Sequence, residues 1–225
     1  MGGGPQIETE GKPISFWEEV KRKLVHLSSF WMVALICLPS TSKIVLFYVF
    51  FACFILNLLV EFAYSCRVPV VTPIYDFFFG KMLRGDVRPG QWVVSGAPPV
   101  FAAAALVCLL YPWQIAATAL GVMLLADTAA ALIGRRFGKC KVNGKTWEGF
   151  AAFWFFGVAF ASAMLWFTGY VRDFPIVGWM IPVAILVAAF AELFEKQLRV
   201  DDNLSIPFLV GLLLWLPRVL LYPPV

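Results

Sequence analysis

The sequence has little charge, a single histidine and no paired cysteines. Asp, Glu, Lys and Arg together make up 14% of its 225 residues, whereas an ordinary soluble domain carries about 25%. The five cysteines show no C-x-x-C spacing, so we interpret them as small apolar core residues. No A-x-A-like cleavage site follows the first apolar run, and we therefore expect no cleavable signal peptide. The low share of charged residues excludes an ordinary soluble domain.

What the sequence has instead is a series of long apolar runs. Hydrophobic residues make up 61% of the chain, and the mean hydropathy is +0.81. A helix rises about 1.5 Å per residue, so about twenty residues cross a hydrocarbon core of about 30 Å. Because lipid offers no partner for backbone N–H and C=O groups, such runs should be helices. The sequence thus predicts an all-α integral membrane protein with seven spans, at residues 24–42, 44–64, 92–111, 115–133, 150–170, 177–195 and 204–222.

Lys and Arg are distributed unevenly between the two sets of predicted loops. If the N-terminus is cytoplasmic, fifteen of the eighteen Lys and Arg residues fall on the cytoplasmic side and three on the far side. By the positive-inside rule we place the N-terminus inside and the C-terminus on the far side. Residues 1–23 are then a cytoplasmic segment, and residues 24–225 form a single polytopic membrane catalytic domain. Residues 66–91 mix prolines, aromatics and cations, which predicts an interfacial segment.

Ionisable residues inside or at the edges of the predicted spans share one depth, on the cytoplasmic side. Such groups are costly in lipid and are functional candidates by default. Asp127 lies six residues before the end of its predicted span, too deep for its short side chain to reach water. Glu61 and Glu195 lie near enough to span ends that a simple helix-end charge explains them equally well. The remaining members of the set are His26, Glu192 and the run Asp201-Asp202-Asn203.

The stretch GRRFGKCKVNGKTWEG, residues 134–149, is unlike the rest of the chain because it holds five cations and four glycines. Cations and backbone N–H groups can hold polyphosphate, and glycine permits close backbone approach. The preceding Asp127 could hold the Mg²⁺ that accompanies a nucleotide. Setting the topology would explain the cations alone, but neither the glycines nor Asp127. The stretch is not a P-loop, since the first glycine of G-x-x-x-x-G-K-[ST] is replaced by Lys139.

The run D-x-x-A-A-x-x-G-R-x-F-G-K-x-K…G-K-T-x-E-G, which starts at Asp127, resembles a block shared by two related families. One family comprises the CTP-dependent lipid-alcohol kinases, which act on dolichol, phytol, farnesol or diacylglycerol. The other comprises the phosphatidate cytidylyltransferases, which make CDP-diacylglycerol. The block is long and specific, but it does not separate the two families.

Other segments favour the kinases. EEVKRKLVHLSSF, residues 18–30, resembles the E-x-x-R-K-x-x-H opening of the polyprenol kinase group, and AELFEKQLRVDDNLSIPFLVG, residues 191–211, is similar to its glutamate followed by D-D-N-L-x-I-P. The K-R…K-D…H-G-G…D-R signature of the cytidylyltransferases has no match. KMLRGDVRPGQW, residues 81–92, is similar to the kinases' R-x-x-E…G block, but it has Asp86 in place of Glu and an altered spacing.

The resemblance implies a kinase that transfers the γ-phosphate of CTP to a lipid alcohol with Mg²⁺ as cofactor. Phosphoryl transfer needs positioning, metal and charge neutralisation more than covalent chemistry. We expect Thr146 and Glu148 to shape the loop or hold a metal-bound water, and Asn203 to bind metal or cap its helix. The expected catalytic residues are Asp127, Glu192, His26 and Lys145; the expected metal ligands are Asp127, Asp201, Asp202 and Asn203. The expected nucleotide-binding residues are Gly134, Arg135, Gly138, Lys139, Lys141, Gly144, Lys145, Thr146 and Glu148; the expected lipid or phosphate ligands are Arg22, Lys23 and Arg84.

Two alternatives stay open beside the kinase. One is a phosphatidate cytidylyltransferase that forms a CDP-lipid, and the other is an ion-coupled transporter that uses the intramembrane carboxylates. Polar groups confined to one face argue against the transporter, because a conduit needs polarity through the midplane. We expect an integral protein of a bacterial inner membrane, with its active site facing the cytoplasm and no nucleic-acid partner. The G-x-x-x-G spacing of GRRFG leaves a homo-oligomer open, although a loop role fits its place at a helix end better.

Overall fold

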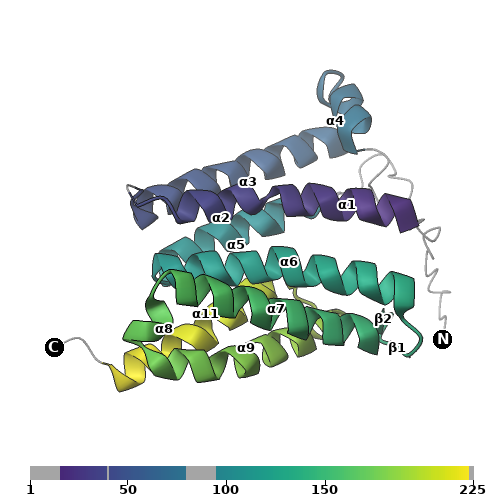
Figure 1. Ribbon diagram of the computed structural model, residues 1–225. Helices are drawn as coiled ribbons and strands as arrows, with labels where there is room; N and C mark the ends of the chain where they lie inside the picture. Colours follow the sequence, from purple (N-terminus) through teal and green to yellow (C-terminus); the bar gives the residue numbers. More distant parts are fainter. Residues whose placement is uncertain (1–15, 40, 80–94, 223–225) are drawn as a thin grey trace, which may run out of the picture.

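The computed structural model describes residues 16–39, 41–79 and 95–222, which form a helical bundle with one small β-hairpin (Figure 1). The longer helices are α1 (Phe16–Ser28), α3 (Lys43–Ser65), α5 (Ala97–Leu110), α6 (Trp113–Phe137), α7 (Trp147–Phe167), α9 (Pro175–Leu193) and α11 (Asp202–Leu221). The shorter ones are α2 (Phe30–Ile36), α4 (Val71–Phe79), α8 (Tyr170–Asp173) and α10 (Glu195–Leu198). Strands β1 (Lys141–Val142) and β2 (Lys145–Thr146) form the hairpin.

Five of these helices are long and apolar enough to cross a membrane: α3, α6, α7, α9 and α11. Helix α5 is apolar but has only 14 residues. The first predicted span, residues 24–42, is divided between the end of α1 and α2, with a break at Ser29. The prediction of an all-α membrane protein is confirmed at this level, whereas the count of seven spans and the sidedness stay predictions.

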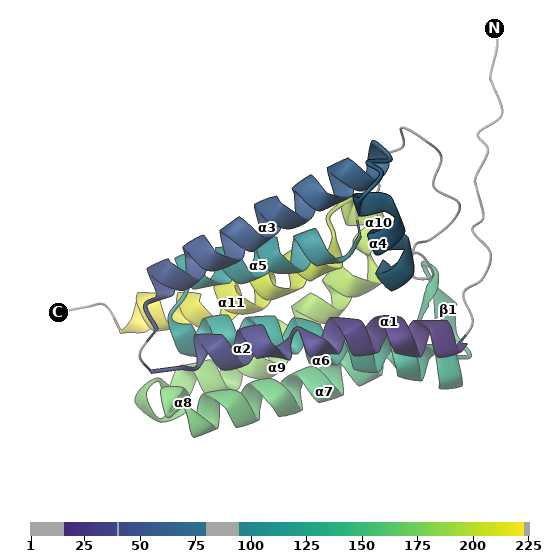
Figure 2. The ribbon, with the colours of Figure 1, turned by 90° about the horizontal axis from the view of Figure 1, so that it is seen from above.

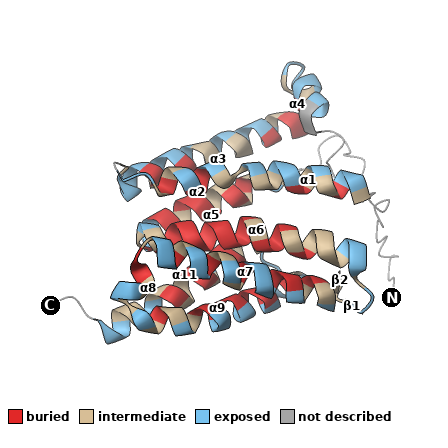
Figure 3. Cartoon of the chain, viewed as in Figure 1, coloured by how far each residue is buried: buried red, intermediate tan, exposed pale blue. Residues whose placement is uncertain are grey.

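Helix α6 lies at the centre of the bundle and is the most buried of the long helices (Figure 3). It packs against α1, α2, α5, α7 and α11. Its sequence explains this position, because WQIAATALGVMLLADTAAALIG is rich in Ala, Gly and Thr, and small residues let neighbouring backbones approach closely. Helix α3 differs in packing mainly against α5, so most of its surface is exposed, as for a helix that faces lipid.

The helices alternate in direction, so the chain returns repeatedly to one end of the bundle. The first turns of α1, the helices α4 and α10 and the hairpin all gather at that end, while α8 lies at the other (Figures 1 and 2). Every buried charged side chain of the described residues belongs to a part of a helix that lies at this end, and we call it the polar end. The five are Glu19, Lys23, Glu61, Asp127 and Glu192.

Two predicted regions differ in their local structure. Helix α6 continues to Phe137, so the GRRF part of the predicted loop is helical and Asp127 lies ten residues, about 15 Å, from the helix end. The predicted interfacial segment, residues 66–91, contains α4, whose Ile74 side chain is 55% exposed. Arg84 and Asp86 of that segment lie outside the described residues, so the lipid-binding prediction for Arg84 stays a prediction.

Gly211 offers a test of the helix packing. It lies in α11 against the ring of Tyr111, which is buried and whose hydroxyl donates to the Phe208 carbonyl at 3.0 Å. A Cβ atom at position 211 would lie 2.2 Å from Tyr111 Cε2. We expect Gly211→Ala to destabilise the protein by about 1–3 kcal/mol through overpacking, measured as a lower thermal unfolding temperature in detergent. Gly96→Ala is the matched control, because no atom lies within 4 Å of its added Cβ; equal melting of the two variants would contradict this packing.

Candidate functional site

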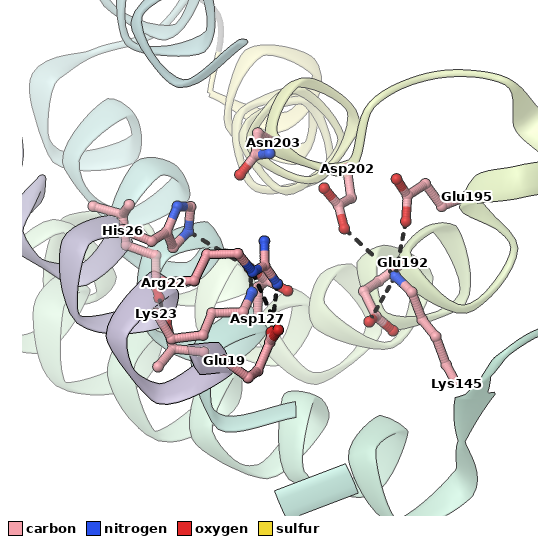
Figure 4. Close-up of polar contacts among 12 residues, drawn as sticks. Glu19, Arg22, Lys23, His26, Asp127, Lys145, Glu192, Glu195, Asp202 and Asn203 are labelled. Carbon is pink, nitrogen blue, oxygen red and sulfur yellow. Dashed lines mark hydrogen bonds and ion pairs between the residues drawn. The ribbon is translucent and has the colours of Figure 1, made fainter. Parts of the chain in front are cut away.

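The centre of the polar end is an ion pair between α1 and α6. The Lys23 ammonium donates to Asp127 Oδ2, and both residues are buried, with 4% and 6% of their surface exposed. His26 lies one turn further along α1, with its Nε2 3.5 Å from the same Oδ2 and no hydrogen-bond partner among the described residues (Figure 4). The spacing of Lys23 and His26 at i and i+3 puts both on one face of α1, so one carboxylate faces both side chains.

The second buried carboxylate of the polar end is Glu19 of α1, which contacts two arginines. Glu19 is 2% exposed; it accepts hydrogen bonds from Arg22, and Arg135 at the end of α6 lies 3.5 Å away. Burial acts to raise the pKa of Glu19, but the hydrogen bonds and charge of Arg22, with the charges of Arg135 and Lys23, lower it on balance. Glu19 is therefore ionised at neutral pH and holds both guanidinium groups, of which that of Arg22 lies within electrostatic range of Asp127.

Lys145 gathers three carboxylates from three other elements. Its Nζ lies 2.8 Å from Glu192 of α9, 3.1 Å from Glu195 of α10 and 3.4 Å from Asp202 of α11 (Figure 4). Burial alone would lower the pKa of Lys145, but Glu192 and Asp202 raise it well above its usual value. Lys145 is thus a fixed cation, and its group of three carboxylates and one ammonium lies within electrostatic range of Asp127.

The β-hairpin places Lys145 beside these carboxylates. Asn143 and Gly144 have φ of 54° and 82°, the two positive values of a type I′ turn. The turn pairs Val142 with Lys145, so the hairpin projects Lys145 from β2. This hairpin was missed in the sequence, where residues 134–149 were interpreted as a glycine-rich loop; the Asn-Gly dipeptide is the signal that predicts it.

The other glycines of the stretch 134–149 serve helix packing. A Cβ on Gly134 would lie 2.7 Å from Thr146 Oγ1, and one on Gly149 would lie 2.9 Å from the Ala130 carbonyl, so both let α6 and α7 approach around Thr146. Thr146 is the N-cap of α7 and accepts from Gly149 N at 3.1 Å. The Gly138 amide donates to the Gly134 carbonyl at 3.0 Å. These contacts support a loop-shaping role for Thr146, and they commit the Gly138 amide, which was expected to bind phosphate, to the end of α6.

Glu148 also shapes this loop. Its Oε1 accepts from the backbone N–H groups of Lys139 and Cys140 at 2.9 and 3.4 Å. Of the two predicted roles, loop shaping is the one that this geometry supports. The side chains of Lys139 and Lys141 are exposed beside the hairpin. Of the predicted phosphate-binding cations, Arg135 and Lys145 thus lie beside carboxylates, whereas Lys139 and Lys141 lie exposed at the hairpin.

The run Asp201-Asp202-Asn203 divides in the same way. Asp201 is exposed and is the N-cap of α11, since its Oδ1 accepts from the backbone and side-chain nitrogens of Asn203, each at 2.9 Å. Asn203 thus donates to the cap rather than providing it. Asp202 points the other way, towards Lys145 (Figure 4). We call the charged side chains that meet around Lys23 and Lys145 the polar cluster; they are Lys23, Asp127, Lys145, Glu192, Glu195 and Asp202. Of the predicted metal-binding residues, Asp127 and Asp202 belong to it.

The arrangement of these carboxylates bears on the expected Mg²⁺. Within residues 16–39, 41–79 and 95–222, no group of three or more His, Cys, Asp or Glu residues is arranged to hold a metal ion. Mg²⁺, however, is usually held by one or two carboxylates together with substrate phosphates and waters. Asp127 and Asp202 are oxygen donors of this kind and lie close enough to affect one another electrostatically. The donor set therefore fits an Mg²⁺ ion that arrives with a nucleotide.

Glu19 and Glu195 were not among the predicted site residues. Glu19 was quoted only as part of the E-x-x-R-K-x-x-H pattern, although its spacing of three from Arg22 predicts a pair on one helix face. For Glu195, a functional role and a simple helix-end charge were left equally open, and only the fold shows that it meets Lys145 from β2. No local pattern in the sequence could have indicated that contact, because fifty residues separate the two.

Comparison with known proteins gives two curated relatives that match part of the chain. One is the uncharacterized protein RP860 of Rickettsia prowazekii, 31% identical over 131 residues, which are 58% of this chain and 62% of the relative. The other is the uncharacterized protein MJ1137 of Methanocaldococcus jannaschii, 36% identical over 118 residues, which are 51% of this chain and 55% of the relative. The match thus spans less than two thirds of either relative. No family model and no solved structure matches the chain.

The Lys23–Asp127 pair predicts a double-mutant effect on stability. Lys23→Met should destabilise the protein by about 3–5 kcal/mol, because it leaves the buried Asp127 charge without its partner. Lys23→Met combined with Asp127→Asn should recover most of that loss, since no buried charge is then unpaired. Thermal unfolding in detergent measures both, with Lys21→Met on the exposed side of α1 as the control. A double variant as unstable as the sum of the single variants would show that the two residues do not interact.

Proposed function

We propose that this chain is a membrane-embedded kinase that transfers the γ-phosphate of CTP to the hydroxyl of a lipid alcohol. The main support for the proposal is that cations paired with carboxylates meet at one end of an otherwise apolar bundle. Lys23 meets Asp127, and Lys145 meets Glu192 and Asp202, from elements far apart in the sequence. The choice of CTP and of a lipid alcohol rests on the resemblance of the stretches around Asp127, His26 and Asp202 to the polyprenol kinase group.

The cations at the polar end suit a polyphosphate ligand. Arg22, Arg135 and Lys145 are partly exposed, and each is held beside a carboxylate. Phosphate oxygens form charge-assisted hydrogen bonds with such cations. A nucleotide that arrives at this end would therefore take up cations that are already positioned. This preorganisation is the main contribution that a protein makes to phosphoryl transfer.

The carboxylates suit the metal and the proton. Asp127 and Asp202 would hold Mg²⁺, which neutralises charge on the phosphates when bound. In the transfer, the lipid oxygen forms a bond to the γ-phosphorus, the bond from that phosphorus to the β-phosphate oxygen breaks, and CDP leaves. The hydroxyl proton passes to a base. Glu192 is 5% exposed and His26 has an unpartnered Nε2, so these two are the candidates.

The depth of the cluster supports a lipid acceptor over a soluble one. Asp127 lies about 15 Å inside the end of α6, and Lys23 reaches it from α1. Around them, α1 exposes apolar side chains such as Leu24, which is 60% exposed. A lipid alcohol whose tail lies in the bilayer would bring its hydroxyl to the headgroup level, beside this cluster.

Labelled CTP tests the proposed reaction. Purified protein in lipid vesicles is given a lipid alcohol, Mg²⁺ and CTP labelled at either the α- or the γ-phosphate. We expect γ-label in a lipid monophosphate and no α-label in lipid. α-Label in lipid with release of pyrophosphate would replace the kinase by a cytidylyltransferase. No label in any lipid, together with ion flux across the vesicle membrane, would favour the transporter.

Asp127 tests the role of the cluster in that reaction. Asp127→Asn keeps the shape of the side chain and removes its charge, so we expect a loss of about a hundredfold or more in transfer rate. Because this substitution leaves the buried Lys23 ammonium without its counter-charge, we also expect a lower thermal stability, and the transfer rate is therefore measured per amount of folded protein. Lys21→Ala, on the exposed side of α1, should keep full activity. A fully active Asp127→Asn variant would remove Asp127 from the mechanism.

A further inference from the structure

One buried carboxylate at the polar end has no role in the reaction described above. Glu61 lies on α3, four residues before its end, and is 2% exposed. Its Oε1 accepts from the backbone N–H of Ser95 at 3.0 Å. Its Oε2 is also buried, but it finds no hydrogen-bond partner in the part of the chain that the structure describes. A buried carboxylate oxygen without a partner costs free energy, and it is a ready acceptor for a ligand that brings a donor.

The elements around Glu61 form a defined corner between α3, α4 and the start of α5. Tyr64 of α3 stacks on Tyr75 of α4, with ring centroids 4.3 Å apart, and donates to Asp76 at 2.6 Å. Tyr75 is buried and lies beside Glu61 and Ser95. The Ser95 hydroxyl accepts from the Ala97 amide at 3.2 Å and so holds the start of α5. The Glu61 carboxylate is thus held through Oε1 by Ser95, and its Oε2 remains without a hydrogen-bond partner among the described residues.

The outer surface of this corner is apolar. Leu59 of α3 is 59% exposed, Val70 in the turn before α4 is 69% exposed, and Ile74 of α4 is 55% exposed. Apolar side chains on a short helix beside a membrane span are typical of a segment that lies at the lipid interface. A ligand that reaches Glu61 from this side therefore meets an apolar surface first and a hydrogen-bond acceptor second. A long apolar tail with one hydroxyl matches both.

We propose that Glu61 is a docking site for the lipid alcohol, whose hydroxyl donates to Oε2 while its tail lies against α3 and α4. The identity of the ligand as a lipid alcohol rests on the proposed function. Helix α5, which begins beside Ser95, packs against α11, whose first residue is Asp202 of the polar cluster. Helix α5 thus connects the docking site to the helix that begins with Asp202, and the lipid passes along it to the site of transfer.

A glutamine at this position separates the docking role from the structural one. Ser95 N–H needs an acceptor, so Glu61→Gln keeps its amide oxygen there and puts an NH₂ group in the place of Oε2. The contact that fixes α5 survives, but the acceptor for the ligand is lost. Asn57→Ala is the matched control, since Asn57 lies one turn earlier on α3 and, among the described residues, donates to Cys53 O of its own helix.

The experiment uses the full chain in lipid nanodiscs without nucleotide. The probe is a prenyl alcohol that carries a diazirine near its hydroxyl, and mass spectrometry locates the crosslinked peptides. We expect labelling at the end of α3, at α4 or at the start of α5, and a drop of about tenfold in Glu61→Gln but not in Asn57→Ala. The unlabelled alcohol should compete, and its methyl ether, which has no donor, should not.

Three results would overturn the docking site: no labelling in this corner, equal labelling of Glu61→Gln, or equal competition by the methyl ether. Kinetic constants of Glu61→Gln distinguish a failure of the docking site from a failure of the proposed kinase reaction. If γ-phosphate transfer occurs, Glu61→Gln should raise the KM for the lipid alcohol about tenfold and leave the KM for CTP and kcat within about twofold. If labelling depends on Glu61 but no phosphate is transferred, the proposed kinase activity is wrong and the docking site is supported.

Discussion

The contact between Lys23 and Asp127 is the constraint on which the arrangement of the polar end depends. Asp127 lies well inside the central helix α6, in a part of the chain where a lone carboxylate would be costly. Its partner comes from α1, which packs on α6 but has few other neighbours. The ion pair therefore fixes both the depth and the rotation of α1. Once Lys23 is fixed, Arg22 and His26 on the same helix are fixed too, one beside Glu19 and the other beside Asp127.

A second constraint is the hairpin, which brings a cation to the opposite side of the cluster. Asn143 and Gly144 take positive φ, so β2 turns back over the end of α6 and places Lys145 against α9, α10 and α11. Lys145 lies within 3.4 Å of three carboxylates, so the carboxylates outnumber the cation that they contact. Arg22 and Arg135 lie on the other side. A ligand that combines phosphates with a divalent cation is complementary to both halves.

Much of the fold could be predicted from the sequence, because apolar runs of about twenty residues have few alternatives in lipid. Asp127 and Glu192 could also be singled out, since carboxylates within apolar runs need a reason to be there. The break at Ser29 was not predicted, because the end of α1 and all of α2 belong to one predicted apolar run, residues 24–42. The meeting of Lys145 with Glu195 and Asp202 could not be predicted either, since it depends on how the hairpin, α10 and α11 pack. Gly134 was assigned to phosphate binding, which stays a prediction; its close approach to Thr146 depends on how α6 and α7 pack and could not be read from the sequence.

The proposed reaction requires a nucleoside triphosphate to bind at the polar end, between α1, the hairpin and the start of α11. Hydrogen–deuterium exchange of the protein in nanodiscs, with and without CTP and Mg²⁺, tests it most directly. Binding there should slow exchange in three separate segments at once: the first half of α1, residues 139–146 and residues 195–204. Each holds amides close to the charged side chains that would meet the phosphates. No change in these segments, or a change confined to α8 at the other end of the bundle, would contradict it.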